Sequence, residues 1–168
     1  MDFLELAKER YSVRVYSDEP VEEEKINKIL EAGRVAPTAH NNQPQRIYVI
    51  QSKDAREKVK KCTRYSFNAP IILLLCYDED ESWFGQNDRF GSIDPTIVGT
   101  HMMLEATELG LGTVWVGSFN AEITKSEFAL PSNIIPVAFL PLGYPFHTSE
   151  PSVMHASRKN LLETVRYL

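Results

Sequence analysis

The spacing of apolar residues predicts helices and strands that alternate along one chain. Residues 2–10, 20–32 and 94–109 place apolar side chains on one side at helical intervals. Ser52 favours a further helix over 54–61, because a serine at this position can accept a hydrogen bond from the first turn. The chain therefore has four candidate helices before its C-terminal tail.

Runs of apolar and β-branched residues predict the strands. The run at 71–77 is apolar throughout, which is typical of a strand buried on both faces. Further strands are expected at 46–51, 113–116 and 134–142. The last of these contains two prolines, which cannot donate to a sheet ladder and favour an edge position or a short core. Residues 160–168 carry four apolar side chains at helical spacing and need a partner surface.

Composition limits the class of protein. The 168 residues, 43% of them hydrophobic, predict a single domain over 1–168 with its own core, of α+β or three-layer type. The net charge of −5 and the lack of a basic stripe argue against nucleic acid as a partner. The apolar run near 71–76 is too short to cross a membrane, and Asp2 and Glu5 argue against a signal peptide. Cys62 and Cys76 form no disulfide or metal pattern, so we expect a cytoplasmic protein without a metal.

The first candidate site is a cluster of charge at the end of the first predicted helix. Arg10, Tyr11, Ser12 and Arg14 place two guanidiniums and a hydroxyl within five residues. Guanidiniums offer a planar fork of donors that fits a phosphate. The alternative is an ordinary charged helix end.

The second candidate is a polar loop at 36–44, with Pro37, Thr38, Ala39 and Asn41. Its small polar groups can present hydrogen bonds to a flat polar ring, although such residues are also ordinary in surface loops. A third segment, 110–119, reads Gly-Leu-Gly-Thr-Val-Trp-Val-Gly-Ser-Phe, a helix end that leads into a strand. A fourth combines 143–145 with His-Ala-Ser-Arg-Lys at 155–159.

Together and in this order, the four segments resemble the nitroreductase family of FMN-dependent flavoproteins. The family pattern begins with Arg-Arg-Ser-Val-Arg and continues with Pro-Ser-Ala-x-Asn-x-Gln-Pro. Here Tyr11 replaces the second arginine and Thr38 replaces the serine. Ala156 stands where many members have a lysine, which suggests a rearranged phosphate clamp. The resemblance implies a three-layer fold, with a central mixed sheet flanked by helices, in an intertwined homodimer.

The resemblance also implies a flavin site shared between two chains. Arg10 and Ser12 would lie on the phosphate and ribityl side, and Arg14 near the flavin N1 and C2 carbonyl. The loop at 37–44 would reach the flavin of the other subunit, and the backbone of 116–118 would face the flavin edge. The implied cofactor-binding residues are Arg10, Tyr11, Ser12, Arg14, Pro37, Thr38, Ala39, Asn41, Val116, Gly117, Ser118 and Arg158.

The expected function is transfer of a hydride from NAD(P)H through FMN to an electron-poor acceptor, such as a nitroaromatic or a quinone, in a ping-pong cycle. No side chain is assigned as catalytic, because the cofactor carries the difficult step. Alternatives are another flavin reaction on the same scaffold, such as flavin destruction or dehalogenation, a non-catalytic FMN-binding protein, or a domain without a cofactor. The acidic run at 78–81 could mark a Mg²⁺ site, but a solvated turn is the preferred interpretation. A hydrolase is disfavoured because no Gly-x-Ser-x-Gly elbow is present.

Overall fold

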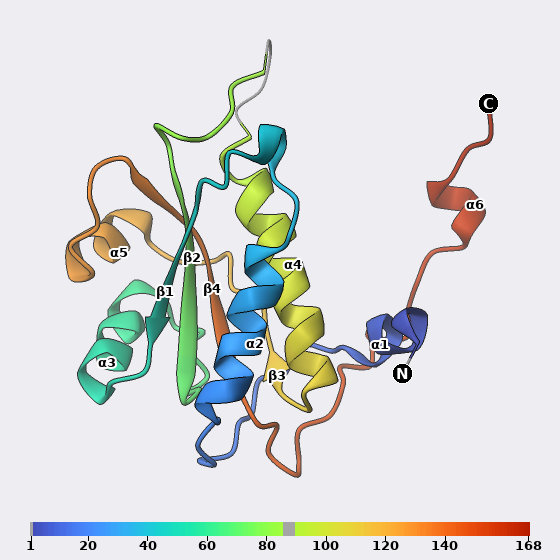
Figure 1. The fold of residues 1–168 in the computed structure, drawn as a ribbon. Helices are drawn as coiled ribbons and strands as arrows, with labels where there is room; N and C mark the ends of the chain where they lie inside the picture. The colour runs from blue at the N-terminus through green and yellow to red at the C-terminus, as the bar shows by residue number, and fades with distance from the viewer. Residues whose placement is uncertain (1, 86–89) are drawn as a thin grey trace.

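The computed structural model describes residues 2–85 and 90–168, and its centre is an antiparallel sheet (Figure 1). Within these ranges the strands are β1 (Gln45–Ile50), β2 (Ile71–Asp78), β3 (Gly112–Thr113) and β4 (Ile134–Gly143), in the order β1-β2-β4-β3. Every neighbouring pair of these strands is antiparallel. A parallel pairing is present as the single bridge between Ser12 and Thr113.

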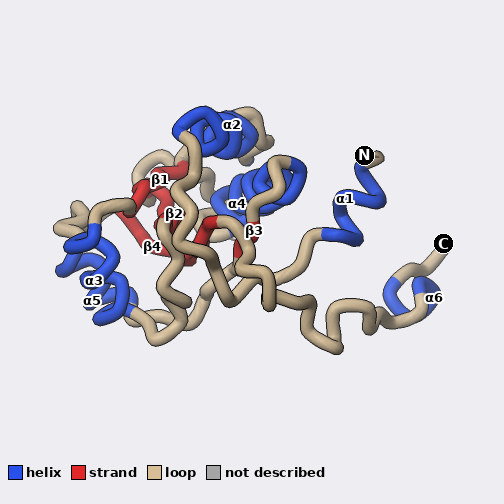
Figure 2. The backbone as a smooth tube through the Cα atoms, turned by 90° about the horizontal axis from the view of Figure 1, so that it is seen from below, coloured by secondary structure: helices blue, strands red, loops and turns tan. Residues whose placement is uncertain are grey.

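Helices cover both faces of the sheet (Figures 1 and 2). The described helices are α1 (Phe3–Glu9), α2 (Glu23–Arg34), α3 (Lys53–Cys62), α4 (Ile93–Glu108), α5 (Ala121–Glu127) and α6 (Leu161–Thr164), with a 3₁₀ turn, η1, at Ala39–Asn41. The helices α2 and α4 lie on one face, and α3 and α5 lie on the other. The predicted α+β class and the three layers are confirmed.

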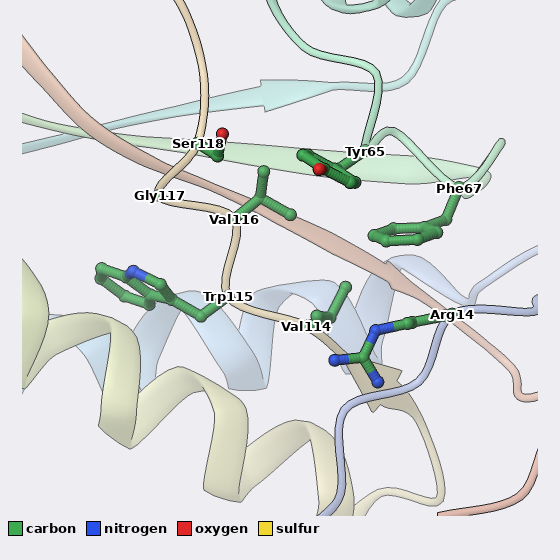
Figure 3. Close-up of a pocket in the computed structure, with 8 residues that line it drawn as sticks. All are labelled: Arg14, Tyr65, Phe67, Val114, Trp115, Val116, Gly117 and Ser118. Atoms are coloured by element: carbon green, nitrogen blue, oxygen red, sulfur yellow. The ribbon is translucent and has the colours of Figure 1, made fainter. Parts of the chain in front are cut away.

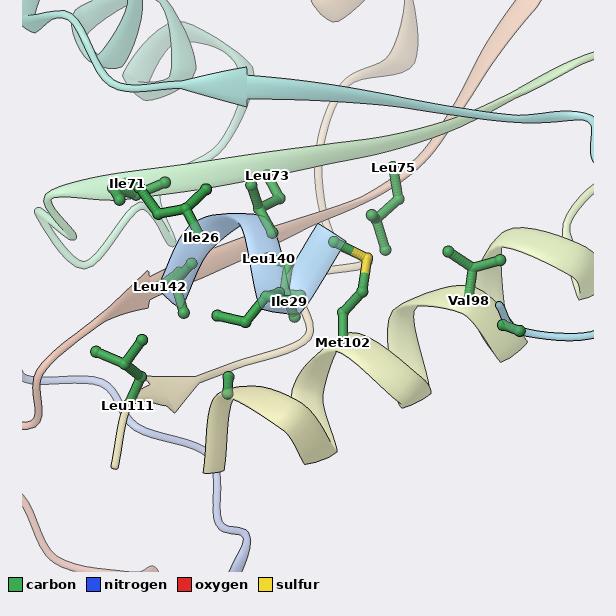
Figure 4. Packing of buried hydrophobic residues seen from close by; sticks show 12 residues of the cluster. Ile26, Ile29, Ile71, Leu73, Leu75, Val98, Met102, Leu111, Leu140 and Leu142 are labelled. Carbon is green, nitrogen blue, oxygen red and sulfur yellow. The ribbon is translucent and has the colours of Figure 1, made fainter. Parts of the chain in front are cut away.

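Strand β2 is the middle of the core because its side chains alternate between the two helical layers. Leu73 and Leu75 pack with Ile29 and Met102 in the cluster beneath α2 and α4 (Figure 4). Leu74 and its alternate neighbours pack in the second cluster, with residues of α3. The prediction of a strand buried on both faces is confirmed.

Both cysteines belong to the core. Cys62 and Cys76 lie in the second cluster and are free thiols. Burial raises the pKa of both, that of Cys76 to about 12. Neither thiol is available as a thiolate near neutral pH, which agrees with a packing role.

The position predicted for the strand at 134–142 is wrong. Strand β4 lies between β2 and β3 and is ten residues long. A β-bulge between Leu75 and Cys76 takes the β4 register from Ala138 to Pro136, so the first proline lies beside the irregularity. On its other side β4 pairs with β3 only through its last two residues, beyond Pro141. Both prolines stand opposite β2 residues, Pro136 opposite Cys76 and Pro141 opposite Ile72, but neither pairs with β3, so on that side β4 needs no hydrogen bond from them.

Two further expectations are corrected at the ends of elements. The strand expected at 113–116 is reduced to two residues, because after Thr113 the chain pairs with β4 only at the bridge between Val116 and Phe139. The tail at 160–168 is not a continuous helix. Helix α6 makes one turn, and Val165 is already extended, with φ −119° and ψ 141°.

Candidate functional site

A cavity of about 370 Å³ opens beside β3, where the N-terminal segment pairs with this strand (Figure 3). Its lining residues are Arg14, Tyr65, Phe67, Val114, Trp115, Val116, Gly117 and Ser118. Four of the predicted cofactor-binding residues, Arg14 and those at 116–118, therefore meet in one place. The cavity is within the size range of small-molecule sites.

Arg14 reaches the cavity because the N-terminal segment is fixed to β3. The amide of Val13 donates a hydrogen bond to the carbonyl of Thr113 at 3.0 Å. Gly112 permits this approach, since a Cβ there would lie 2.3 Å from Cγ2 of Val13. The exposed Arg14 side chain then donates to the carbonyl of Ser12 at 3.1 Å. Its other N–H groups have no hydrogen bond among the described residues and can take a ligand.

The floor of the cavity is backbone. Val116 exchanges two hydrogen bonds with Phe139, of 2.9 and 3.0 Å, and this pairing holds the segment against β4. Gly117 and Ser118 then leave the sheet and are exposed. A Cβ at Gly117 would meet nothing nearer than Nε1 of Trp115 at 3.6 Å, an ordinary contact. Neither packing nor a positive φ requires glycine here, so its effect is to leave the backbone open to the cavity.

Tyr65 and Phe67 complete the wall, and neither is among the residues predicted from the sequence. Their segment is tied to the cavity floor by Thr63, whose hydroxyl donates to the carbonyl of Ser118 at 2.7 Å. Phe67 has a φ of 52°, in the left-handed region that non-glycine residues seldom adopt. Two aromatic residues two positions apart before a buried strand are the only local sequence signal, and it is weak.

Arg10 and Tyr11 precede the contact of Ser12 with β3 and do not line this cavity. The hydroxyl of Tyr11 donates to the carbonyl of Ser149 at 3.2 Å, and its ring makes an edge contact with His155 at 6.3 Å. Arg158, at the end of this C-terminal segment, donates to local carbonyls, including that of its neighbour at 2.8 Å. Arg10 is half-buried, and its side chain makes no hydrogen bond within the described part of the chain.

The loop at 37–44 is at the opposite end of α4. The amide of Ala39 donates to Oδ1 of Asp94, in the first turn of that helix, at 2.9 Å. The hydroxyl of Thr38 accepts from the amide of Gln43 at 3.0 Å, which closes the loop. Asn41 is exposed and has a φ of 56°. Pro37 also lies in this loop, before η1.

The N-terminal cluster and the loop are therefore far apart within one chain. The 16 residues of α4 span about 24 Å. The loop lies at the start of this helix, and β3, which binds Ser12 and Val13, follows its end (Figure 1). The structure brings Arg14 to the backbone of 116–118 but does not bring the loop to Arg10.

The acidic turn after β2 has a structural role. The guanidinium of Arg46 contacts Asp78 at 3.2 Å and Glu81 at 2.6 Å. The other oxygen of Asp78 accepts from the side-chain amide of Asn133 at 2.9 Å. Among the residues that the structure describes, no group of three or more His, Cys, Asp or Glu could hold a metal ion. No described helix is long and apolar enough to span a bilayer.

Comparison with known proteins points to one family. The model of the Nitroreductase family matches residues 7–70 and 65–144. The crystal structure of a nitroreductase family protein from Clostridium difficile 630 is 45% identical, with a TM-score of 0.93, and the match covers 99% of this chain and 98% of that one.

The names of two curated relatives are consistent with this family. A protein of Methanothermobacter thermautotrophicus whose name gives NADH dehydrogenase/NAD(P)H nitroreductase is 34% identical over 86% of this chain and 78% of its own length. A protein of Bacillus subtilis named FMN reductase [NAD(P)H] is 28% identical over 80% of this chain and 62% of its own length.

Proposed function

Because the chain belongs to the Nitroreductase family, we propose that it is an FMN-dependent oxidoreductase that passes a hydride from NAD(P)H to an electron-poor acceptor. The observation that carries this proposal is the cavity beside β3, which is lined by the guanidinium of Arg14, by exposed backbone at 117–118 and by an aromatic wall. The acceptor class is a nitroaromatic or a quinone, and the whole chain, 1–168, forms the single domain that does this work.

The residues of the cavity fit a flat, polar ring. Tyr65, Phe67 and Trp115 supply apolar surface, and the missing side chain at Gly117 lets a ring approach the main chain. The amides of Gly117 and Ser118 take part in no described backbone hydrogen bond, so they can donate to a ligand. Such a mixture of apolar walls and a few fixed donors is typical of cofactor sites.

The protein contributes binding and electrostatics. FMN, when bound, supplies the redox chemistry, so that no side chain has to act as a general acid or base. Arg14 would lie beside the part of the ring that gains negative charge and would stabilise it. Arg10, Tyr11, Ser12 and Arg158 would hold the phosphate end. Reductant and acceptor would use the same cavity in turn, which is the ping-pong order.

A second copy of the chain completes the proposed site. The loop that carries Pro37, Thr38, Ala39 and Asn41 is too far from the Arg10 end of its own chain, so it would serve the cavity of its partner. Helices α1 and α6 project from one side of the body (Figures 1 and 2). Their apolar side chains include Phe3 at 70% exposure and Leu162 at 65%. Such surface indicates a protein interface, here that of an intertwined homodimer.

Two experiments test the proposal: the flavin absorbance of the purified protein, and the removal of the charge of Arg14. The purified protein is expected to be yellow, to release FMN on denaturation, and to bleach anaerobically with NADH or NADPH. Arg14→Met removes the charge at similar length and is expected to lower the flavin potential and to reduce the hydride-transfer rate at least about tenfold. Arg34→Met, which removes an exposed charge paired with Glu31, is the control.

The outcomes separate the candidate functions. A colourless protein that takes up no FMN would refute a flavin site. A yellow protein that neither reductant bleaches would be an FMN-binding protein without this activity. An Arg14→Met variant that retains FMN with an unchanged potential would exclude the assigned role of Arg14.

A further inference from the structure

A second cavity borders the chain segment that carries Tyr65 and Phe67. It has a volume of about 200 Å³ and is lined by Lys53, Arg56, Glu57, Lys60, Ser66, Asn68, Ala69 and Ile72. Most known sites for whole small molecules are larger than this. The second cavity is therefore of a size to hold one end of a ligand.

The two cavities share one short segment of chain, 65–69. Tyr65 and Phe67 line the first cavity, whereas Ser66, Asn68 and Ala69 line the second. Neighbouring side chains of this segment thus serve different cavities. The backbone turns sharply here, since Phe67 and Asn68 both have a φ of 52°. Left-handed residues in succession are costly and tend to persist at functional sites. An extended ligand that crosses this segment could occupy both cavities.

The second cavity is positive in a negative protein. Residues 53–64 contain six of the 18 lysines and arginines of the chain and two acidic residues, although the whole chain has a net charge of −5. Three of these cations, Lys53, Arg56 and Lys60, line the cavity, against the single carboxylate of Glu57. The walls thus carry a net charge of +2. A phosphate monoester carries a charge of about −1.5 to −2 at pH 7 and would balance them.

The donors of the cavity are largely uncommitted. The guanidinium of Arg56 makes one hydrogen bond, to the carbonyl of Ala69 at 3.5 Å, and its Nε is buried without a partner among the described residues. Lys60 pairs with Glu57 at 2.7 Å, and Lys53 has no described ion pair. The hydroxyl of the buried Ser66 and the side-chain amide of Asn68 add neutral donors. A planar guanidinium with several free N–H groups suits a phosphate better than a single ammonium does.

We infer that this cavity binds the 2′-phosphate of NADPH, an inference that rests on the proposed function and names its reductant. The nicotinamide would lie over the flavin at the mouth of the first cavity, the dinucleotide would pass Tyr65 and Phe67, and the phosphate would sit among Lys53, Arg56 and Lys60. NADH lacks this phosphate and gains nothing from these charges. The protein accordingly uses NADPH in preference to NADH.

Kinetics of the FMN-loaded protein test this inference. The kcat/KM for NADPH is expected to exceed that for NADH at least about tenfold, through KM. Arg56→Gln should remove most of this difference and leave the NADH values within about twofold. Lys53→Gln, an exposed substitution at the start of α3, should act in the same direction if Arg56→Gln fails to fold. Lys58→Gln is the matched control, because Lys58 is on the same helix but does not line the cavity.

A binding experiment makes the test independent of catalysis. By calorimetry, 2′,5′-ADP should bind the parent protein at least about tenfold more tightly than Arg56→Gln, and 5′-AMP should bind neither. This result would support the cavity even if neither reductant bleached the flavin and the proposed function failed. Equal use of NADH and NADPH by the parent would overturn the inference. So would inorganic phosphate that binds as tightly as 2′,5′-ADP, since the site would then serve free phosphate.

Discussion

Two glycines near β3 show how one residue type can serve the fold at one position and the cavity at another. A Cβ at Gly112 would lie 2.3 Å from the side chain of Val13, whereas at Gly117 the nearest atom would be 3.6 Å away. Gly112→Ala is expected to lower the free energy of unfolding by about 1–3 kcal/mol, as overpacked sites do. Gly117→Ala should leave the melting temperature unchanged or slightly raised, since it only restricts the unfolded chain.

For cofactor binding, the two substitutions should have the opposite order of effect: Gly117→Ala should be the more damaging one. The methyl group of Gly117→Ala would enter the cavity and is expected to weaken FMN binding about tenfold in a fluorescence titration. The folded fraction of Gly112→Ala should lose far less affinity. An alanine at 117 that binds FMN as tightly as the parent would show that the open backbone does not face the cofactor.

Residue patterns located the cavity only in part. The family resemblance placed Arg14 and the backbone of 116–118 beside one flavin, and these residues line one cavity, whereas their contact with a flavin stays a prediction. Tyr65 and Phe67 could not be predicted, because the left-handed turn at Phe67 that aims the segment has no glycine to mark it. The packing of β2 against α3 and the hydrogen bond from Thr63 place this segment, and neither is a local property of the sequence.

At the scale of elements, Asp94 connects a helix to the candidate cofactor loop. Its side chain is 1% exposed, and Oδ1 accepts the amide of Ala39 at 2.9 Å. A carboxylate in the first turn of α4 also interacts favourably with the positive end of the helix dipole. Asp94→Ala leaves the partly buried amide of Ala39 unpaired and is expected to cost about 1–3 kcal/mol of stability and to reduce FMN retention. Asp94→Asn keeps an acceptor and should be milder in both respects.

Urea unfolding of the two variants, with flavin absorbance after gel filtration, checks this prediction. If Asp94→Ala loses stability but keeps its FMN, the loop is held by Asp94 without contributing to the flavin site. If it matches the parent in both, the buried contact has no energetic role.

Helices and strands were predictable where residues close together in the sequence determine them. The cap of α3 is such a case: the Ser52 hydroxyl accepts the amide of Ala55 at 3.2 Å, as predicted. The interior position of β4 depends on a bulge that accommodates Pro136, and a bulge is settled by the pairing of two strands. Helix α5 was not predicted, because its one clear signal is Asn120, whose side chain accepts the amide of Ile123 at 2.9 Å. One capping residue before seven helical ones is too little to identify a helix.

At the scale of the whole molecule, the alternation of helical and strand patterns predicted the fold class and the layers. It did not predict the conformation of the C-terminal tail. The tail at 160–168 has the apolar spacing of a helix, yet α6 makes only one turn. A single turn is not stable in isolation and depends on packing against another surface. Leu161 and Leu162 are each 65% exposed, so in one chain that surface is missing. The covering surface expected here is a second copy.

Deletion of 160–168 therefore tests the proposal that two chains share the flavin site. Because α6 contains no buried residue, the truncated chain should keep its fold and its circular dichroism. The dimer should weaken, and FMN should be released with it, since a ligand that binds only the assembled state is linked to assembly by mass action. Light scattering and flavin absorbance on the same samples measure both. A full-length Leu161→Ser, Leu162→Ser double variant is the control for chain length and should show the same linked loss. A truncated protein that becomes monomeric and yet keeps its full complement of FMN would mean that one chain is sufficient to bind the cofactor.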